Sequence, residues 1–381
     1  MSSALVDSRI HVLFLIISQS IGGAELHTIS VAKNLDPGRF RATLVYLKDE
    51  DDLGAFLSRS GKHVHVFCGG VERKLDINTL KRLSHYVESE GVNIVVCANV
   101  YPLFYGWLVK LLSRRNVTIV EILHTAKPLT LRGSLRMSIL IPFFRLVDML
   151  VYVCENQRTY WRNRALRSRN ERVIRNGIDV SLFQNNFTID ELELFRNEFG
   201  FSKDDYIVGM CGYMRPEKAH ADLVRALLLV RQTGQKVKSI IIGDGPTRGA
   251  VEELIRGSGL GEHIVVTGLI EDVRLAICSC DIIAVPSHND NFPISVLESM
   301  SLGRPVVMAD VGGASELLEH TRDGFIYRRG DIEQLASYIR LLADASLRAD
   351  VGRNAALSAS KNFTSEEMVR RYESMFASLT S

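Results

Sequence analysis

One segment of this chain reads Ser287-His-Asn-Asp-Asn-Phe-Pro-Ile-Ser-Val-Leu-Glu-Ser-Met-Ser-Leu-Gly303, and it lies between two apolar runs, 282–285 and 305–308. The order predicts strand, loop, helix and strand. Pro293 suits the first helical position, and Gly303 suits the residue just past the helix end. Strands joined through helices in this way are typical of parallel α/β sheets.

The same segment carries two acids. Asp290 would lie in the loop and Glu298 on the helix, with seven residues between them. Backbone N–H groups and the macrodipole at a helix start favour anionic ligands, and carboxylates accept hydrogen bonds from hydroxyls. This combination suits a sugar nucleotide. It is also compatible with a capped core helix that carries solvated carboxylates.

Short apolar runs alternate with amphipathic helical patterns along the whole chain, as expected for parallel sheets covered by helices on both faces. At 381 residues the chain is long enough for two such domains. We predict an α/β protein with doubly wound domains at 1–178 and 179–362, an Asn-Gly turn near their junction, and a closing helix at 363–381. The expected strands are 10–17, 42–47, 63–68, 92–97, 117–123 and 149–153, then 206–211, 238–243, 263–267, 281–285, 304–308 and 324–327.

Two further features concern the links between these elements. Residues 184–205 are polar and partly helical, which predicts a linker into the second domain. The closing helix has an apolar stripe that must dock on another element. The stripe consists of Met368, Val369, Tyr372, Met375 and Phe376.

Charge is divided unevenly between the two halves. Residues 1–178 hold 25 Lys and Arg against 15 Asp and Glu, whereas the remainder holds 21 against 29. An Arg-rich cluster at 158–175 follows the mostly apolar stretch 137–154, which is too interrupted by charge to span a membrane. Basic residues beside apolar helical surface favour an anionic lipid surface or acceptor, although a solvated helix face fits equally well. No nucleic-acid partner is expected.

The six cysteines show no paired metal-ligand spacing, and most lie in or beside apolar runs. We therefore expect reduced core cysteines in a cytoplasmic protein. The run at 10–17 is short and is preceded by charges, so it predicts a first strand and not a signal peptide.

Three loops follow predicted strands. Gly22 and Gly23 open a helical pattern and would let a ligand approach the backbone closely. Arg215 and Lys218 follow the first strand of the second domain, where two cations could neutralise a diphosphate. The third loop, Gly243-Asp-Gly-Pro246, has the wrong spacing for a dinucleotide fingerprint and predicts a turn.

Two other candidates are less specific. His124 ends the fifth strand of the first domain, where a ligand contact competes with an ordinary structural role. Residues 49–52 read Asp-Glu-Asp-Asp and contain an Asp-x-Asp pattern, which can hold a divalent cation on a nucleotide sugar. Because this pattern lies in a charge run before a helical segment, a solvated turn is the better interpretation, and no metal site is predicted.

These segments together resemble glycosyltransferase family 4, retaining enzymes of the two-domain GT-B fold. The resemblance covers nearly the whole chain, and the shared order of its segments is more specific than any one of them. Its elements are Gly-Gly-Ala-Glu25, His124, Asn176-Gly-Ile-Asp179, Arg215 with Glu217 and Lys218, Gly243-Asp-Gly-Pro246, residues 286–303 and Gly312-Gly-Ala-Ser-Glu316.

The resemblance implies that the second domain holds a nucleotide sugar, such as a UDP- or GDP-sugar, across an interdomain cleft. Glu298 would bond the ribose hydroxyls, and Arg215 and Lys218 would stabilise the departing diphosphate without a metal or cofactor. Asp290, with the backbone amides of Asn291 and Phe292, would position the transferred sugar.

In the first domain, the resemblance implies that Gly23 approaches the donor phosphate and that His124 contacts the sugar. The chain departs from the family at one point: the first acid of the seven-residue spacing is usually Glu, whereas here it is Asp290. Asp keeps the charge but is one methylene shorter, which puts the sugar contact in question more than the ribose contact.

The implied activity is transfer of a sugar to a hydroxyl of a glycan, a lipid-linked intermediate or a small molecule, in the cytoplasm or on the inner face of a membrane. A GT-B sugar-nucleotide epimerase would share the fold and the nucleotide site. A non-enzymatic sugar-binding protein is a further alternative. An NAD-linked oxidoreductase is disfavoured because neither domain's first strand is followed by a complete dinucleotide fingerprint.

Overall fold

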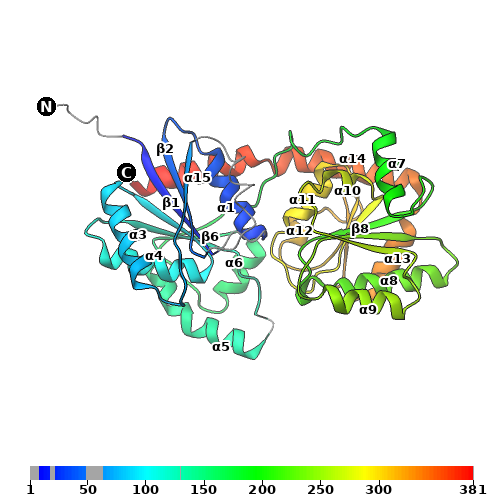
Figure 1. Cartoon of the computed structure of the whole chain (residues 1–381), viewed down its shortest axis with the longest axis horizontal. Helices are drawn as coiled ribbons and strands as arrows, with labels where there is room; N and C mark the ends of the chain where they lie inside the picture. The colour runs from blue at the N-terminus through cyan, green and yellow to red at the C-terminus, as the bar shows by residue number, and fades with distance from the viewer. Residues whose placement is uncertain (1–7, 18–21, 49–62, 129, 381) are drawn as a thin grey trace. The chain divides into compact units, whose positions relative to one another are not determined.

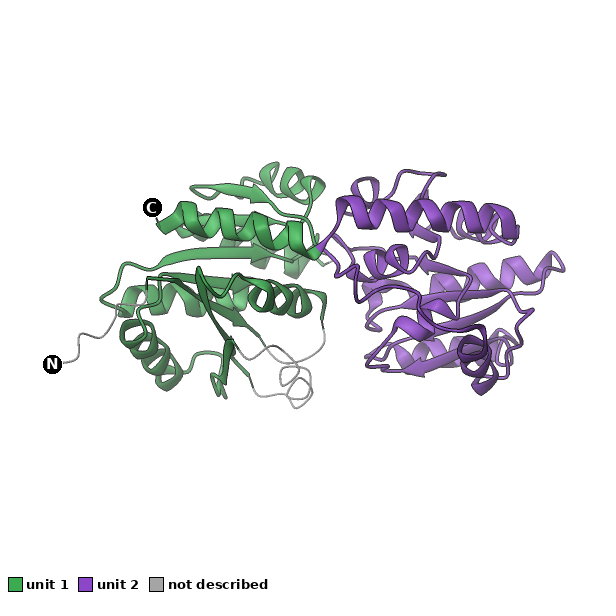
Figure 2. Ribbon diagram, turned by 90° about the horizontal axis from the view of Figure 1, so that it is seen from above, with its two compact units in different colours: residues 1–176, 365–381 green, residues 177–364 purple. Residues whose placement is uncertain are grey.

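The computed structural model of the chain describes residues 8–17, 22–48, 63–128 and 130–380. The chain forms two compact units, which are coloured separately in Figure 2. Unit 1 comprises Met1–Asn176 and Ser365–Ser381, and unit 2 comprises Gly177–Thr364. The last helix therefore belongs with the first half of the chain.

Unit 1 contains a parallel sheet of seven strands in the order β3-β2-β1-β4-β5-β6-β7 (Figure 1). Its central strands are almost wholly buried, which explains their continuous apolar sequences. The strands are β1 (Ile10–Ile16), β2 (Phe40–Tyr46), β3 (Val64–Cys68), β4 (Ile94–Ala98), β5 (Thr118–Leu123), β6 (Met149–Tyr152) and β7 (Glu171–Val173). The helices are α1 (Gly23–Asn34), α3 (Ile77–Ser89), α4 (Val100–Leu112), α5 (Leu131–Leu140), the 3₁₀ helix η1 (Ile141–Leu146), α6 (Glu155–Arg162) and α15 (Ser365–Thr380).

Unit 2 contains a parallel sheet of six strands in the order β10-β9-β8-β11-β12-β13. The strands are β8 (Ile207–Cys211), β9 (Lys238–Ile242), β10 (Ile264–Gly268), β11 (Ile282–Val285), β12 (Val306–Ala309) and β13 (Phe325–Tyr327). The helices are α7 (Ile189–Glu198), η2 (Pro216–Lys218), α8 (His220–Gln232), α9 (Arg248–Gly257), α10 (Arg274–Cys278), α11 (Ile294–Ser301), α12 (Ala314–Leu317), α13 (Ile332–Leu341) and α14 (Ala345–Asn362).

Each sheet has a switch point, where the direction of strand addition reverses. It lies between β1 and β4 in unit 1 and between β8 and β11 in unit 2. Doubly wound sheets bind ligands beyond the carboxyl ends of the strands at such a point. In unit 2 these are the ends followed by Lys218 and Asp290, so the topology brings the two predicted loops together.

The apolar stripe predicted on the closing helix is confirmed, because all five of its side chains are buried. The Phe376 ring lies 6.3 Å from the rings of Phe14 and Phe40, between centroids. Complete burial of one such side chain typically contributes roughly 1.5–3 kcal/mol. This stripe attaches α15 to β1 and α1.

Each of the twelve predicted apolar runs overlaps one strand. The additional strand, β7, was missed because it has three residues and includes the exposed Arg172. It pairs with β6 on one side and ends the sheet, where a short, charged strand is common. The Arg-rich cluster at 158–175 is accordingly divided between α6, a turn and β7, and the helix-face interpretation was wrong.

The partly helical character predicted for 184–205 is confirmed by α7, whereas the linker role was wrong, because this segment packs within unit 2. Thr188 caps α7 in a capping box with Glu191. The Arg196 side chain donates to the carbonyl oxygen of Ser279 at 2.9 Å and lies 3.4 Å from the Asp281 carboxylate.

The six cysteines are unpaired, as predicted, and four of them are buried. Within the described ranges, the helices are too short or too polar to cross a membrane.

Candidate functional site

The loop that carries Asp290 connects the buried strand β11 to α11. Pro293 has extended backbone and is the N-cap residue of α11, so the helix begins at Ile294, one residue later than predicted. Gly303 follows the helix at a φ of 69°, a left-handed conformation that glycine adopts without strain. The predicted strand, loop, helix and strand are therefore present, and Asp290 and Glu298 lie in the loop and on the helix respectively.

Asp290 forms an ion pair with Lys218. The Lys218 Nζ lies 2.6 Å from Asp290 Oδ2, and both side chains are largely shielded from solvent. The other carboxylate oxygen, Oδ1, accepts the backbone N–H of Asn291 at 2.9 Å. Asp290 is therefore held by two donors, and one of them is the Asn291 amide, which the family resemblance implies would contact the sugar.

The loop is fixed to the start of α8 by His288. Its Nε2 lies 2.6 Å from the Asp222 carboxylate, and its backbone N–H donates to the carbonyl oxygen of Glu217 at 2.7 Å. Asp222 is almost fully buried. His288 and Asp222 were not among the predicted site residues, although His288 lies only two positions before Asp290.

Glycine 312 lets a third segment approach the same loop. Gly312 has a φ of 53°, and a Cβ placed there would lie 2.1 Å from the backbone oxygen of Asp290. The next residue, Gly313, donates its N–H to the carbonyl oxygen of Asn291 at 2.7 Å. The predicted glycine pair at 312–313 therefore supports the backbone around Asp290.

Glu298 and Lys218 influence the same thiol, that of Cys211 at the end of β8. Burial raises the pKa of Cys211, the Glu298 carboxyl raises it further, and the Lys218 ammonium lowers it. Burial also raises the pKa of Glu298 to about 7, with a second contribution from the Asp272 carboxylate. Glu298 and Lys218 therefore both lie within electrostatic reach of Cys211, and Asp290 is paired with Lys218.

Arg215 lies in the loop between β8 and η2, three residues before Lys218. Its side chain is exposed, and its guanidinium carbon lies 4.8 Å from the centre of the Tyr213 ring. Its carbonyl oxygen accepts the backbone N–H of Lys218 at 3.0 Å. The sequence thus places both cations after the same strand, and the structure shows Arg215 stacked on an aromatic ring.

The Gly243-Asp-Gly-Pro246 loop packs tightly against the loop after β8. Gly243 has a φ of 142°, and a Cβ there would lie 2.2 Å from the carbonyl oxygen of Gly212. Met214 donates its N–H to the carbonyl oxygen of Asp244 at 2.8 Å. The predicted turn is present, and it supports the backbone that leads to Arg215.

In unit 1, Gly22 is the N-cap of α1 and Gly23 is its first residue, without a side-chain cap. His124 immediately follows β5. Its ring packs edge-to-face on the ring of His27, with 5.0 Å between centroids. His27 is buried on α1, one turn after Gly23, and its Nε2 lies 2.9 Å from the Tyr372 hydroxyl.

Both histidines are neutral near pH 7. Burial lowers the pKa of His27 to about 4, against a smaller opposing effect of Asn176. Burial also lowers the pKa of His124 well below its usual range, and His27 adds to that decrease. A neutral imidazole can donate one hydrogen bond and accept another, which suits a hydroxyl ligand.

Sequence reasoning did not identify His27 and Tyr372 as part of this site. The spacing of four residues between Gly23 and His27 was an available signal, since it places both on one face of α1. Asn99 was also missed. It follows β4 at the switch point with a φ of 74°, and its side chain accepts from the Thr125 hydroxyl at 3.3 Å.

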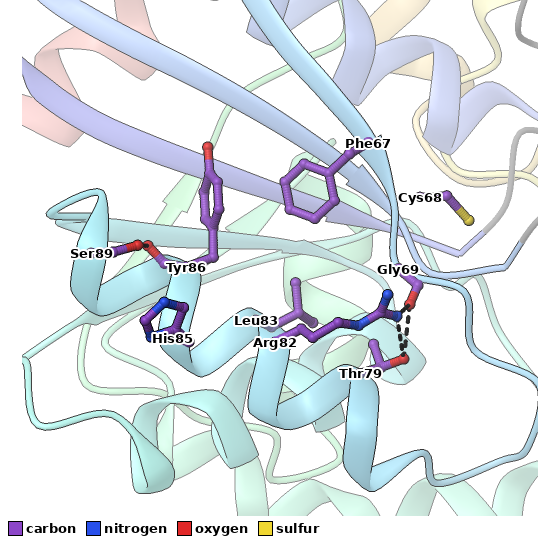
Figure 3. Close-up of a pocket in the computed structure, with 9 residues that line it drawn as sticks. All are labelled: Phe67, Cys68, Gly69, Thr79, Arg82, Leu83, His85, Tyr86 and Ser89. Carbon is purple, nitrogen blue, oxygen red and sulfur yellow. Dashed lines mark hydrogen bonds between the residues drawn. The ribbon is translucent and has the colours of Figure 1, made fainter.

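A depression of about 250 Å³ lies elsewhere in unit 1, between the end of β3 and α3 (Figure 3). Arg82 points toward Gly69 there and bonds its carbonyl oxygen. The residues that line it are Phe67, Cys68, Gly69, Thr79, Arg82, Leu83, His85, Tyr86 and Ser89. None of the predicted site residues contributes to this lining.

Across the residues that the structure describes, no three His, Cys, Asp or Glu side chains form a group able to hold a metal ion. The Asp-x-Asp pattern at 49–52 lies outside the described residues.

Two family descriptions match this chain. "Glycosyltransferase Family 4" matches residues 21–182, and "Glycosyl transferases group 1" matches residues 192–358. The chain is 23% identical to the N-acetyl-alpha-D-glucosaminyl L-malate synthase of Bacillus anthracis over 353 residues, which cover 85% of this chain and 91% of that protein. It is 25% identical to the capsular polysaccharide biosynthesis glycosyltransferase CapM of Staphylococcus aureus over 203 residues, 53% of this chain and 52% of that protein.

Solved structures show the same fold. A crystal structure of Anabaena HepE in complex with UDP-glucose has a TM-score of 0.85 at 23% identity and covers 97% of this chain and 100% of that one. The sucrose-phosphate synthase of Thermosynechococcus elongatus has a TM-score of 0.83 at 18% identity, covering 97% of this chain and 99% of that one.

Proposed function

This chain belongs to glycosyltransferase family 4 and has the GT-B fold, and we propose that it is a retaining enzyme that transfers a hexose-type sugar from a nucleoside-diphosphate sugar to a hydroxyl acceptor. The observation that carries this proposal is the Lys218–Asp290 ion pair at the switch point of unit 2, with Glu298 and Lys218 both within electrostatic reach of Cys211. It provides a cation for a diphosphate, an acid for sugar hydroxyls and a second acid for ribose.

The proposed chemistry follows from where charge develops. When the bond between the sugar carbon C1 and the phosphate oxygen breaks, its electron pair leaves with the diphosphate. Lys218, already fixed by Asp290, would stabilise that charge, and Arg215 would add a second cation. A preorganised charge of this kind typically lowers a barrier by about 3 kcal/mol. The acceptor oxygen then bonds C1 from the face that the diphosphate left, and its hydroxyl proton passes to the departing diphosphate oxygen.

The remaining residues would position the donor. Glu298 would accept hydrogen bonds from the ribose, and Asp290, with the loop at Asn291 and Phe292, would hold the sugar. Gly22 and Gly23 would place the uncapped start of α1 near the donor phosphate. His124, neutral and packed on His27, would bond a sugar hydroxyl. The two cations would make a divalent metal unnecessary.

We propose UDP- or GDP-sugars as donors, and a glycan, lipid-linked or small-molecule hydroxyl as acceptor. The cationic first half of the chain favours an acceptor that is anionic or carried by a membrane. The pathway proposed is glycan or glycolipid biosynthesis, in the cytoplasm or at the inner face of a membrane. CapM, a relative of this chain, is described as acting in capsular polysaccharide biosynthesis.

A thermal-shift screen of nucleoside diphosphates and their sugars tests the donor site, since a ligand that binds the folded state raises Tm. The preferred donor should then release nucleoside diphosphate only when an acceptor is present, at an unchanged rate in EDTA. NMR of the product should show the anomeric configuration of the donor. Failure of every nucleotide to raise Tm would overturn the donor site. A new sugar nucleotide formed without acceptor would indicate an epimerase.

A further inference from the structure

Helix α5 exposes most of its apolar side chains. Of its ten residues, all of them described, one is buried, Met137. Leu131, Leu135 and Ile139 are 91%, 66% and 62% exposed. Because they recur every four residues, they form one stripe along the helix. A stripe of this kind on a surface helix normally packs against a partner.

The stripe continues into η1, where Phe143 and Leu146 are also exposed. The Phe143 ring lies 6.0 Å from the ring of Trp107 on α4, between centroids, so the surface of α4 adjoins it. In Figure 1, α5 lies at the lower edge of unit 1. We call this surface the α5 face, which consists of Leu131, Leu135, Ile139, Phe143 and Leu146.

The charges around the α5 face have one sign. Residues 131–146, which form α5 and η1, contain three arginines, Arg132, Arg136 and Arg145, and no Asp or Glu. Arg132 and Arg136 each follow a leucine of the stripe by one position, so they flank it.

We propose that the α5 face docks on a bilayer that contains anionic lipids. The leucines and Phe143 would enter the boundary between headgroups and acyl chains. The flanking arginines would keep their charged ends among the anionic headgroups while their stems cover apolar surface. This combination of an apolar stripe with basic flanks is typical of helices that lie in a membrane interface.

Charge also argues against a second copy of this chain as the occupant. A twofold-symmetric contact places the same patch on both sides, so arginines would face arginines. A negative surface removes that repulsion. The inference goes beyond the transfer reaction, because it concerns attachment of unit 1 and not the donor site.

The test measures binding of the full chain to vesicles of phosphatidylcholine alone and of phosphatidylcholine with phosphatidylglycerol, by flotation. The chain should bind the anionic vesicles, and added salt should weaken binding. Leu131→Gln with Leu135→Gln should lower vesicle affinity at least about tenfold, since each buried leucine contributes apolar transfer energy. Arg132→Gln with Arg136→Gln should lower it by about fivefold per cation removed.

The matched control changes two leucines in unit 2, Leu194→Gln with Leu357→Gln, which are 64% and 66% exposed. It should bind vesicles like the unchanged chain. Absence of binding to anionic vesicles at low salt would overturn the proposal, as would normal binding by the α5 variants. Sedimentation of the unchanged chain and of each variant measures whether the chain forms a dimer. A dimer that the α5 substitutions dissociate would assign the α5 face to a second copy of the chain and would overturn the proposal.

Nucleotide thermal shifts on the same variants keep this test separate from the proposed function. The α5 variants should keep the shift, since the α5 face shares no residue with the switch point of unit 2. If the chain binds vesicles but no nucleotide raises its Tm, the membrane proposal for the α5 face is supported and the transferase proposal is overturned.

Discussion

The ammonium of Lys218 lies 2.6 Å from the carboxylate of Asp290, although the two residues are 72 positions apart in the chain. The pair spans the switch point, because Lys218 follows β8 and Asp290 follows β11. A lysine held in this way needs little reorganisation when charge develops on a nearby phosphate. Our first prediction concerns this pair.

Lys218→Ala should lower kcat at least about tenfold while the protein remains folded, because a preorganised cation is lost from the transition state. Initial rates of nucleoside diphosphate release, measured with saturating donor, check this value. Near-normal turnover would remove Lys218 from the mechanism.

Lys238→Ala is the matched control for that change. Lys238 forms an ion pair of 2.8 Å with Asp205 in the same unit, with a similar degree of exposure. Both variants lose a partly buried ion pair, so both should lose some stability. A drop in kcat confined to Lys218→Ala would show that the effect is not a general consequence of destabilising unit 2.

The affinity for UDP or GDP should rise between about pH 6 and pH 8. The pKa of Glu298 is raised to about 7 by burial and by Asp272, and only the ionised carboxylate accepts hydrogen bonds from both ribose hydroxyls. Binding should therefore release protons near pH 7. Calorimetry in two buffers of different ionisation enthalpy measures both effects.

Two variants locate the source of that pH dependence. Glu298→Gln should bind UDP or GDP weakly at pH 6, 7 and 8, and its affinity should not rise with pH. Asp272→Asn removes a neighbouring negative charge, so the rise should move to lower pH. An unchanged profile in Glu298→Gln would assign the titration to another group.

Tyr372→Phe should lower the free energy of unfolding by about 1–3 kcal/mol, because it leaves the buried His27 Nε2 without its hydroxyl partner. Denaturant unfolding followed by fluorescence measures the loss.

Tyr206→Phe in unit 2 removes a comparable hydrogen bond, 2.8 Å to the carbonyl oxygen of Ile339. Turnover should fall further in Tyr372→Phe than in Tyr206→Phe, since His27 supports His124. Equal turnover in both would restrict His27 to a structural role.

Glu121→Leu should raise the free energy of unfolding at pH 8. Glu121 is completely buried, its carboxylate oxygens have no hydrogen-bond partner among the described residues, and burial raises its pKa well above the usual value. A raised carboxyl pKa means that the folded state keeps the proton. The contribution of Glu121 to the stability of the wild type is therefore full below about pH 4.5, and it falls as pH rises toward the folded pKa.

The measurement for Glu121 is the unfolding midpoint at pH 5, 6.5 and 8. The advantage of Glu121→Leu should grow with pH. Parallel curves for the two proteins would show that the pKa of Glu121 is not raised in the folded state.

Much of the fold could be predicted because buried parallel strands are recognisable locally. Each needs a continuous apolar run, so twelve strands were found, and α15 was identified by a stripe that one helix face must bury. β7 was missed, and the segment that contains α7 was misread as a linker, because both depend on partners distant in sequence. β7 pairs with β6, and Arg196 of α7 holds the carbonyl oxygen of Ser279.

The sequence by itself determined the residue types and the loops: acids at 290 and 298, cations at 215 and 218, glycines where the backbone needs positive φ, and His124 after a strand. The tertiary structure decided the pairings, which include Lys218 with Asp290, His288 with Asp222, and His124 with His27 and through it Tyr372. Strand and helix signals arise within a few residues, whereas these contacts join segments that are distant in sequence and that the fold of each unit brings together. Burial, which sets the pKa of Glu298 and of both histidines, is likewise a property of the packed chain and not of any short segment.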